Sequence, residues 1–133
     1  MRRLTIVLCC AGVTLSAAPS ESFWKALHWE ETRGRTGAIY GDGGRSFGPL
    51  QISRAYWQDS RVKGKWADCA SLAYSRRVVA AYMQRYAPVA WSTGDYQKLA
   101  RIHNGGPTGH RKRATVAYWH RVRSAMRRYE RNN

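Results

Sequence analysis

Three carboxylates in the first third of the sequence are candidates for chemistry. Glu30 and Glu31 are neighbours, and Asp42 lies eleven positions after Glu31, inside a glycine-rich stretch. The sequence holds eight acidic residues, and the other five fall at helix starts, near a helix end or close to a presumed terminus, where a carboxylate has an ordinary structural role. Glycoside cleavage requires two carboxyl groups in unlike settings, because one must stay protonated to donate to the leaving oxygen while the other is ionised beneath the developing positive charge.

The local sequence suits these two roles. A helix-end glutamate beside Trp24 and Leu27 has the apolar surroundings that favour a protonated acid, and the glycines around Asp42 let a ligand approach the backbone closely. Glu30 lies nearer the middle of the apolar stripe than Glu31, so helical periodicity does not decide which of the two is the acid. The alternative interpretation is purely structural: the glutamates are solvated and Asp42 is a hairpin turn residue, since Asp-Gly turns are common.

The elements that would position these residues are mostly helical. Ser20 or Ser22 can cap a first helix that carries both glutamates at its end. Residues 37–44 predict a short strand that enters the Asp42-Gly43 turn, which is the only strand signal in the chain. Further helices are predicted over 53–59, from Asp68 to a stop at Pro88, from Thr93 or Asp95 to His103, and from Thr115 to Tyr129. We therefore expect an α+β fold, mostly α, with one small β ribbon after the first helix.

The first eighteen residues have the pattern of an export signal. Arg2 and Arg3 precede a mostly apolar run to Leu15, and residues 16–18 (Ser-Ala-Ala) are the small residues typical of a cleavage site. We expect a secretory signal peptide at 1–18, a single domain at 19–133, and a secreted or periplasmic product. The apolar run is short for a bilayer span, so we expect no membrane anchor in the mature chain.

The charge of the chain suggests a polyanionic partner. It carries 23 basic and 8 acidic residues, a formal net charge of +15, and such a protein is attracted to bacterial wall polymers as well as to nucleic acid. A non-catalytic basic binder, using residues 110–113 (His-Arg-Lys-Arg) and the arginine-rich last helix, is therefore an alternative to an enzyme. The four histidines lack metal-ligand spacing, and Cys69 is the only cysteine after the predicted signal. We expect no metal, no cofactor, no intrachain disulfide and a buried, inert Cys69.

Several motifs, in order, cover nearly all of the predicted mature chain. They are D-G-G-R-S-F-G-P-L-Q-I at 42–52, Y-W-Q-D at 56–59, D-C-A-S at 68–71, Y-M-Q-R-Y at 82–86, A-R-I-H-N-G-G-P-T-G at 100–109 and Y-W at 118–119. In these motifs the chain resembles the invertebrate-type (destabilase-like) lysozymes. The resemblance implies the lysozyme-like fold and a secreted muramidase that hydrolyses the β-1,4 bond between N-acetylmuramic acid and N-acetylglucosamine in peptidoglycan.

The resemblance also assigns roles to individual residues. The family's acid is a glutamate usually followed by serine, which places the general acid/base on Glu31, followed here by Thr32. Asp42 is then the nucleophile or cation stabiliser, and the family implies retention of anomeric configuration. The motifs further imply that the sugar groove is lined by Gln51, Tyr56, His103, Asn104 and Gly105. For His103, a cap at the helix C-terminus is the alternative role.

The chain departs from the family pattern at two places. Animal members are rich in disulfides, but Phe47 and His110 stand where those members tend to place cysteines, so the chain resembles a bacterial offshoot. Some members are credited with cleaving glutamyl-lysine isopeptide bonds by a serine and a lysine; Ser46 matches that serine, but Ser53 stands where the lysine is expected. A lytic transglycosylase of the same fold, which can work with one glutamate and forms an anhydro product, is the alternative enzyme.

Overall fold

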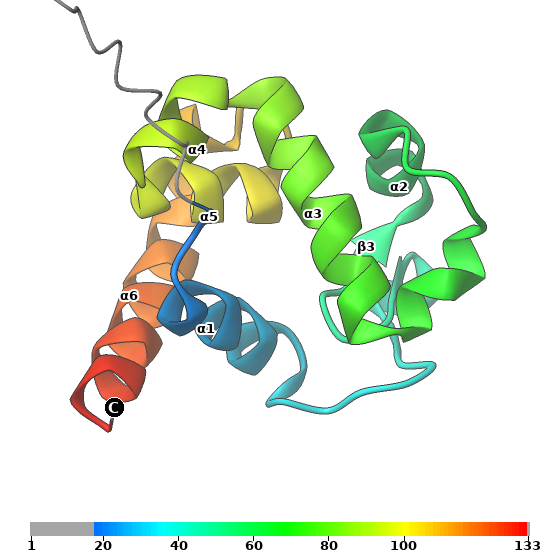
Figure 1. Ribbon diagram of the computed structural model, residues 1–133, viewed down its shortest axis with the longest axis horizontal. Coiled ribbons are helices and arrows are strands. Elements are labelled where there is room, and N and C mark those ends of the chain that lie inside the picture. Colours follow the sequence, from blue (N-terminus) through cyan, green and yellow to red (C-terminus); the bar gives the residue numbers. More distant parts are fainter. Residues whose placement is uncertain (1–17, 133) are drawn as a thin grey trace, which may run out of the picture.

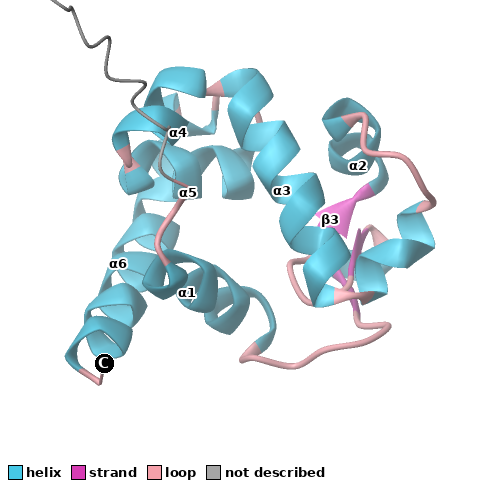
Figure 2. Ribbon diagram, viewed as in Figure 1, coloured by secondary structure: helices cyan, strands magenta, loops and turns pink. Residues whose placement is uncertain are grey.

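The computed structural model describes residues 18–132, where six α-helices accompany a three-stranded antiparallel sheet. In chain order the elements are α1 (Glu21–Thr32), β1 (Tyr40–Gly41), β2 (Ser46–Phe47), β3 (Ile52–Ser53), α2 (Arg54–Ser60), α3 (Leu72–Tyr86), α4 (Pro88–Thr93), α5 (Tyr96–Gly105) and α6 (Val116–Arg131). Short 3₁₀ turns lie at Asp42–Gly44, Trp66–Ala70, Gly109–Arg111 and Arg113–Thr115. Helix dominates the molecule, as Figure 2 shows, and the predicted α+β class with a small ribbon after the first helix is confirmed.

Two of the polar residues predicted at helix starts cap their helices. The Ser20 side chain accepts from an amide in the first turn of α1, and Asp95 does the same for α5. The start of α3 was predicted wrongly. Its cap is Ser71, whose hydroxyl accepts from the Tyr74 amide, whereas Asp68 lies in the preceding 3₁₀ turn and accepts from the Lys65 amide at 2.7 Å. The aspartate does satisfy a free amide, but one turn earlier than the helix.

Helix α4 was not predicted, because Pro88 was interpreted only as a stop. Helix α3 does end before it, at Tyr86, with Ala87 between the two helices. Proline lacks an amide hydrogen and has a fixed φ, so it is as suited to the first position of a new helix as it is unsuited to the interior of an old one. In this chain Pro88 is accordingly the first residue of α4, which covers residues 88–93.

The ribbon has two strands more than the single strand predicted. The strand expected over 37–44 is reduced to Tyr40–Gly41, which pairs with β2, and β2 pairs in turn with β3, so that Phe47 lies opposite Ile52. Strands β2 and β3 were missed because a strand of two residues is too short to show the alternation of side chains from which strands are recognised. The turn between β1 and β2 begins at Asp42, as predicted.

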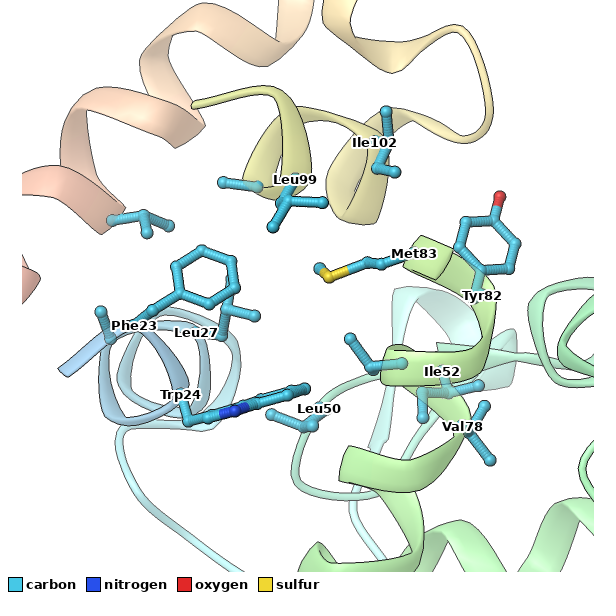
Figure 3. Close-up of a cluster of buried hydrophobic side chains, with 14 of the residues drawn as sticks. Phe23, Trp24, Leu27, Leu50, Ile52, Val78, Tyr82, Met83, Leu99 and Ile102 are labelled. Carbon is cyan, nitrogen blue, oxygen red and sulfur yellow. The ribbon is translucent and has the colours of Figure 1, made fainter. Parts of the chain in front are cut away.

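One hydrophobic core joins the helices to the ribbon. Phe23 and Leu27 of α1 are fully buried, and Figure 3 shows them facing Leu99 of α5 and Met83 of α3. Ile52 brings β3 into the same core, and each of these side chains contributes roughly 1.5–3 kcal/mol by its burial. In Figure 1, α3 runs between α1, α5 and α6 on one side and the ribbon with α2 on the other. Helix α3 is therefore the central helix of the fold.

Two further predictions meet different outcomes. Cys69 is buried, as predicted, and burial together with the Asp68 charge raises the pKa of its thiol to about 11, so the thiol stays protonated. The signal-peptide prediction falls on residues 1–18 and, apart from Ala18, lies outside the described residues. Between residues 18 and 132 no helix is long and apolar enough to cross a membrane.

Candidate functional site

A groove of about 390 Å³ lies between the ribbon, α2, α3 and the end of α5. Each of these elements contributes part of its wall, and we call it the ribbon groove. Its lining residues are Asp42, Ser46, Gln51, Ser53, Ala55, Tyr56, Asp59, Tyr82, His103, Asn104, Gly106 and Pro107. Five of the seven predicted site residues are among them: Asp42, Gln51, Tyr56, His103 and Asn104.

The other two predicted residues, Glu31 and Gly105, do not line the groove. Glu31 adjoins it, because its Oε1 lies 3.3 Å from Nε2 of the lining residue His103. Gly105 serves packing instead: a Cβ there would lie 2.5 Å from Cγ2 of Thr115, and its carbonyl accepts from Nζ of Lys112. The glycine motif around it therefore allows the chain after α5 to pack closely.

Glu31 is held in a partly enclosed position at the end of α1. Its side chain is 17% exposed, and its Oε1 accepts a 2.7 Å hydrogen bond from the hydroxyl of Tyr118 on α6. Burial raises the pKa of the Tyr118 hydroxyl well above its ordinary value, and the negative charge of Glu31 raises it further. Tyr118 is therefore a permanent donor to the Glu31 carboxylate.

The end of α1 that carries Glu31 is fixed to the loop before β3. Thr32, the next residue, is buried, and its hydroxyl lies within hydrogen-bond distance of the carbonyls of Arg35 and Pro49, the latter at 2.9 Å. This contact ties the helix end to the segment that leads into the ribbon. Thr32 thus has a structural role that its hydroxyl explains.

His103 connects Glu31 to the groove. Its side chain is 2% exposed, and its Nδ1 lies 3.0 Å from the Tyr56 hydroxyl. Burial raises the pKa of that hydroxyl well above its ordinary value, so it keeps its proton. In the tautomer with hydrogen on Nε2, the ring accepts from Tyr56 and donates to Glu31. Among the described residues the ring's partners are these two side chains, so His103 does not act as the alternative helix cap.

Asp42 occupies a contrasting, open setting. Its backbone is left-handed (φ 53°), and its side chain is 65% exposed. Arg45 pairs with it twice, because its Nη2 donates to Oδ1 at 2.9 Å and its Nε donates to the Asp42 carbonyl at 3.0 Å. The carboxylate therefore lines the groove beside the positive charge of Arg45.

Helical periodicity does not decide between Glu30 and Glu31, but the two residues have different partners in the structure. Glu30 forms ion pairs with Arg33 and Arg121 and lines a separate cavity with them. Glu31 instead contacts His103 and Tyr118. Only Glu31 is bonded to a residue of the ribbon groove.

Gln51 lines the groove but uses its amide to brace the ribbon. Its Nε2 donates to the carbonyls of Ile39 and Gly48 at 3.1 and 2.9 Å, and its backbone is left-handed (φ 50°). Its Oε1 occupies the space beside Gly41, where a Cβ would lie only 1.9 Å away. Gln51 thus holds β1 in place next to Asp42.

Asp59 and Tyr82 line the groove and were not predicted as site residues. Asp59 was given an ordinary role near the end of α2, but its Oδ2 accepts from the Tyr86 hydroxyl at 3.0 Å. Tyr82 stacks on Tyr56 with 3.6 Å between ring centroids, and burial raises the pKa of its hydroxyl to about 12. Tyr82 and Tyr86 are spaced four apart on α3, and that spacing is the signal that could have identified this wall.

No group of three or more His, Cys, Asp and Glu within residues 18–132 could hold a metal ion. Ser46, which matches the serine of the isopeptide-cleaving members, lines the ribbon groove. Ser53, which stands where their lysine is expected, lines it too, and the lining includes no lysine.

Comparison with known proteins relates this chain to one family. A family model described as Destabilase matches residues 31–125. "Lysozyme 1" of Crassostrea virginica is 47% identical over 81 residues, which cover 59% of this chain and 44% of that protein. "Lysozyme" of Meretrix lusoria is 42% identical over 82 residues, which cover 60% of this chain and 67% of that protein. The chain thus spans less than half the length of the first of these relatives.

Solved structures show the same architecture. The Meretrix lusoria lysozyme in its crystal structure with Aeromonas hydrophila PliI superimposes with a TM-score of 0.68 at 34% identity, covering 80% of this chain and 89% of that one. The crystal structure of Tapes japonica lysozyme gives a TM-score of 0.65 at 32% identity, covering 80% and 92%. The predicted lysozyme-like fold is confirmed.

Proposed function

The chain belongs to the Destabilase family, and on that basis we propose that it is a glycoside hydrolase of the lysozyme type. Its substrate in this proposal is peptidoglycan, and the bond cleaved is the β-1,4 linkage between N-acetylmuramic acid and N-acetylglucosamine. Relatives that share 47% and 42% identity with it are named lysozymes, which supports this assignment. The export pattern of residues 1–18 supports action outside the cytoplasm, on a cell wall.

The observation that carries the proposal is the placement of two unlike carboxylates at one groove. Asp42 lines the ribbon groove, and Glu31 is bonded to His103, which lines it too. One carboxylate is exposed beside a permanent cation, and the other is enclosed among groups that carry no fixed charge. Environments that differ in this way are what separate an acid from an ionised partner in glycosidases.

The proposed roles follow from these environments. Glu31 donates a proton to the leaving oxygen and later takes one from water, while Asp42 stabilises or traps the positive sugar. Oε1 of Glu31 already accepts from Tyr118, whereas Oε2 has no hydrogen-bond partner within residues 18–132. Oε2 is therefore the oxygen available to carry the transferred proton. The family resemblance implies retention of anomeric configuration.

The test is the release of reducing ends from purified peptidoglycan. We expect Glu31→Gln to lower kcat by a factor on the order of 10² or more, because it removes general acid-base catalysis. Asp42→Asn should lower it by at least about tenfold through the loss of negative charge under the sugar. Glu30→Gln is the matched control, with the same chemical change one residue away, and should stay within about twofold of wild type. Wild-type turnover by the Glu31 and Asp42 variants would exclude the proposal.

One observation keeps the transglycosylase as a second candidate. Glu31 is the enclosed carboxylate and Asp42 the exposed one, and a single enclosed glutamate is what a lytic transglycosylase uses. Mass analysis of the muropeptides separates the two reactions. A hydrolase gives reducing ends and depends on Asp42, whereas anhydro products together with full turnover by Asp42→Ala would establish the transglycosylase.

A further inference from the structure

A second cavity, of about 330 Å³, opens next to the ribbon groove. It is lined by Gly44, Arg45, Ser53, Arg54 and Trp66, and we call it the arginine cavity. Ser53 of β3 lines both cavities, so they adjoin at this residue. A ligand that runs along the ribbon groove can therefore reach the arginine cavity with a side group.

The indole ring of Trp66 lines the arginine cavity and is held in place by its contacts with the ribbon. The Trp66 Nε1–H donates to the Ile52 carbonyl at 2.9 Å, and its ring lies 5.2 Å from that of the buried Phe47, measured between centroids. The guanidinium of Arg54 lies over the indole, 4.4 Å from the ring centroid. Stacking of this kind orients a guanidinium and leaves the donors at its edge directed away from the ring.

The cations of this cavity are only partly neutralised. Arg54 is exposed, and within the described part of the chain its guanidinium forms no ion pair and donates no hydrogen bond. Arg45 pairs with Asp42 on one edge, and its side chain is 77% exposed. No carboxylate lines the arginine cavity, so its electrostatic character is set by two arginines.

We propose that the arginine cavity binds an oxyanion carried by the polymer whose glycan occupies the ribbon groove. This inference rests on the proposed function and adds to it a preference for charged over neutral glycan. Planar guanidinium groups pair with carboxylate and phosphate oxygens in the same geometry. A bacterial wall offers both, as the carboxylates of its peptide stems and as the phosphates of attached polymers.

The proposal is tested by comparing one variant on charged and neutral substrates. Arg54→Gln should lower kcat/KM on peptidoglycan that carries its peptide stems by roughly threefold to tenfold, the value of an exposed charge-assisted contact. Cleavage of a neutral N-acetylglucosamine hexamer should stay within about twofold of wild type. Equal losses on the charged and the neutral substrate, or no loss on any wall preparation that carries stem carboxylates or phosphate polymers, would overturn the inference.

Arg77→Gln is the matched control. Arg77 is also an exposed arginine stacked over an aromatic ring, that of Tyr74 at 5.7 Å, but it lies on α3 outside both cavities. The substitution removes the same charge, so it measures the general attraction of a basic protein to an anionic wall. If it reduces peptidoglycan cleavage as much as Arg54→Gln does, the arginine cavity has no specific role.

The source of the oxyanion is decided by the substrate preparation. A loss on walls stripped of phosphate polymers identifies the stem carboxylates, and a loss only on unstripped walls identifies the phosphates. Either result supports the cavity.

Direct binding separates failure of this inference from failure of the proposed function. Two probes, a muropeptide with free carboxylates and glycerol phosphate, are titrated into ¹⁵N-labelled protein while the Trp66 indole resonance is followed. At least one of them should shift that resonance in the wild type, and Arg54→Gln should lose the shift. A wild-type protein that binds in this way but cleaves nothing would refute the proposed activity alone. Absence of any shift would refute the cavity assignment.

Discussion

Glu31 and Asp42 differ in what surrounds each carboxylate. Asp42 has a permanent cation at 2.9 Å and wide solvent exposure, whereas Glu31 is partly enclosed by Tyr118 and His103, whose charge is zero or conditional. Carboxylates in unlike surroundings are what glycosidases use for unlike roles. This difference between the two sites matters more for their roles than their spacing in the sequence.

Tyr118→Phe tests how far Glu31 depends on its enclosure. The substitution keeps the ring in place and removes the donor to Oε1, so we expect kcat to fall by about tenfold through loss of orientation. Stability should fall by about 1 kcal/mol, the value of a typical hydrogen bond. Peptidoglycan turnover and thermal unfolding measure the two effects.

Tyr74→Phe is the control for that experiment. The Tyr74 hydroxyl bonds to the Trp57 indole and the Lys63 carbonyl, so its loss should affect stability but not turnover. Full activity in Tyr118→Phe would show that Glu31 is positioned without it.

Among the structural elements, the ribbon depends on a close contact made by one glycine. Gly41 leaves room for the Gln51 side chain, whose amide donates to two ribbon carbonyls. The strands themselves have two residues each and therefore few ladder hydrogen bonds of their own. The position of Asp42 thus relies on a side-chain brace more than on strand pairing.

Gly41→Ala should break this brace. A Cβ at this position would lie 1.9 Å from Gln51 Oε1, so the amide must move and lose its contacts, at a cost of about 1–3 kcal/mol. Chemical denaturation measures that cost. In a Gln51→Ala background the same substitution should cost less than about 1 kcal/mol, because the clashing group is absent. Equal costs in both backgrounds would contradict the role given to Gln51.

The elements show where prediction from sequence succeeds. Ser20 and Asp95 could be identified as caps because a cap acts on amides three residues away. The partner of Glu31 could not be identified, because Tyr118 lies 87 positions away and the contact depends on how α1 packs against α6. Asp59 was missed for a similar reason, since its position at the groove is set by tertiary structure.

At the scale of the whole molecule, one buried thiol and three buried tyrosine hydroxyls have raised pKa values and together affect how stability depends on pH. Burial raises the pKa of Cys69 to about 11 and that of Tyr82 to about 12, and it raises those of Tyr56 and Tyr118 well above their usual values. These groups bind more protons in the folded than in the unfolded chain once the pH exceeds their unfolded values. The fold should therefore lose stability on the alkaline side.

This alkaline loss is measurable as a slope. From about pH 9 upward, the free energy of unfolding should fall by up to about 1.4 kcal/mol per pH unit for each such group that is titrating in the unfolded state. Urea denaturation at intervals between about pH 8 and about pH 11 gives the curve. Cys69→Ala should flatten its first part, because it removes the group with the lowest unfolded pKa. Constant stability across this range would show that the buried hydroxyls and thiol are not coupled to folding.

The lack of a partner cysteine for Cys69 within residues 18–132 affects the conditions under which the domain can fold. From Ala18 to Asn132 the polypeptide contains this single, buried sulfhydryl, so its packing, caps and ribbon hold together without any cross-link. A reductant has no bond to break in this region, and thiol exchange cannot scramble it. The domain can therefore form in the reducing interior of an expression host, where disulfides do not persist.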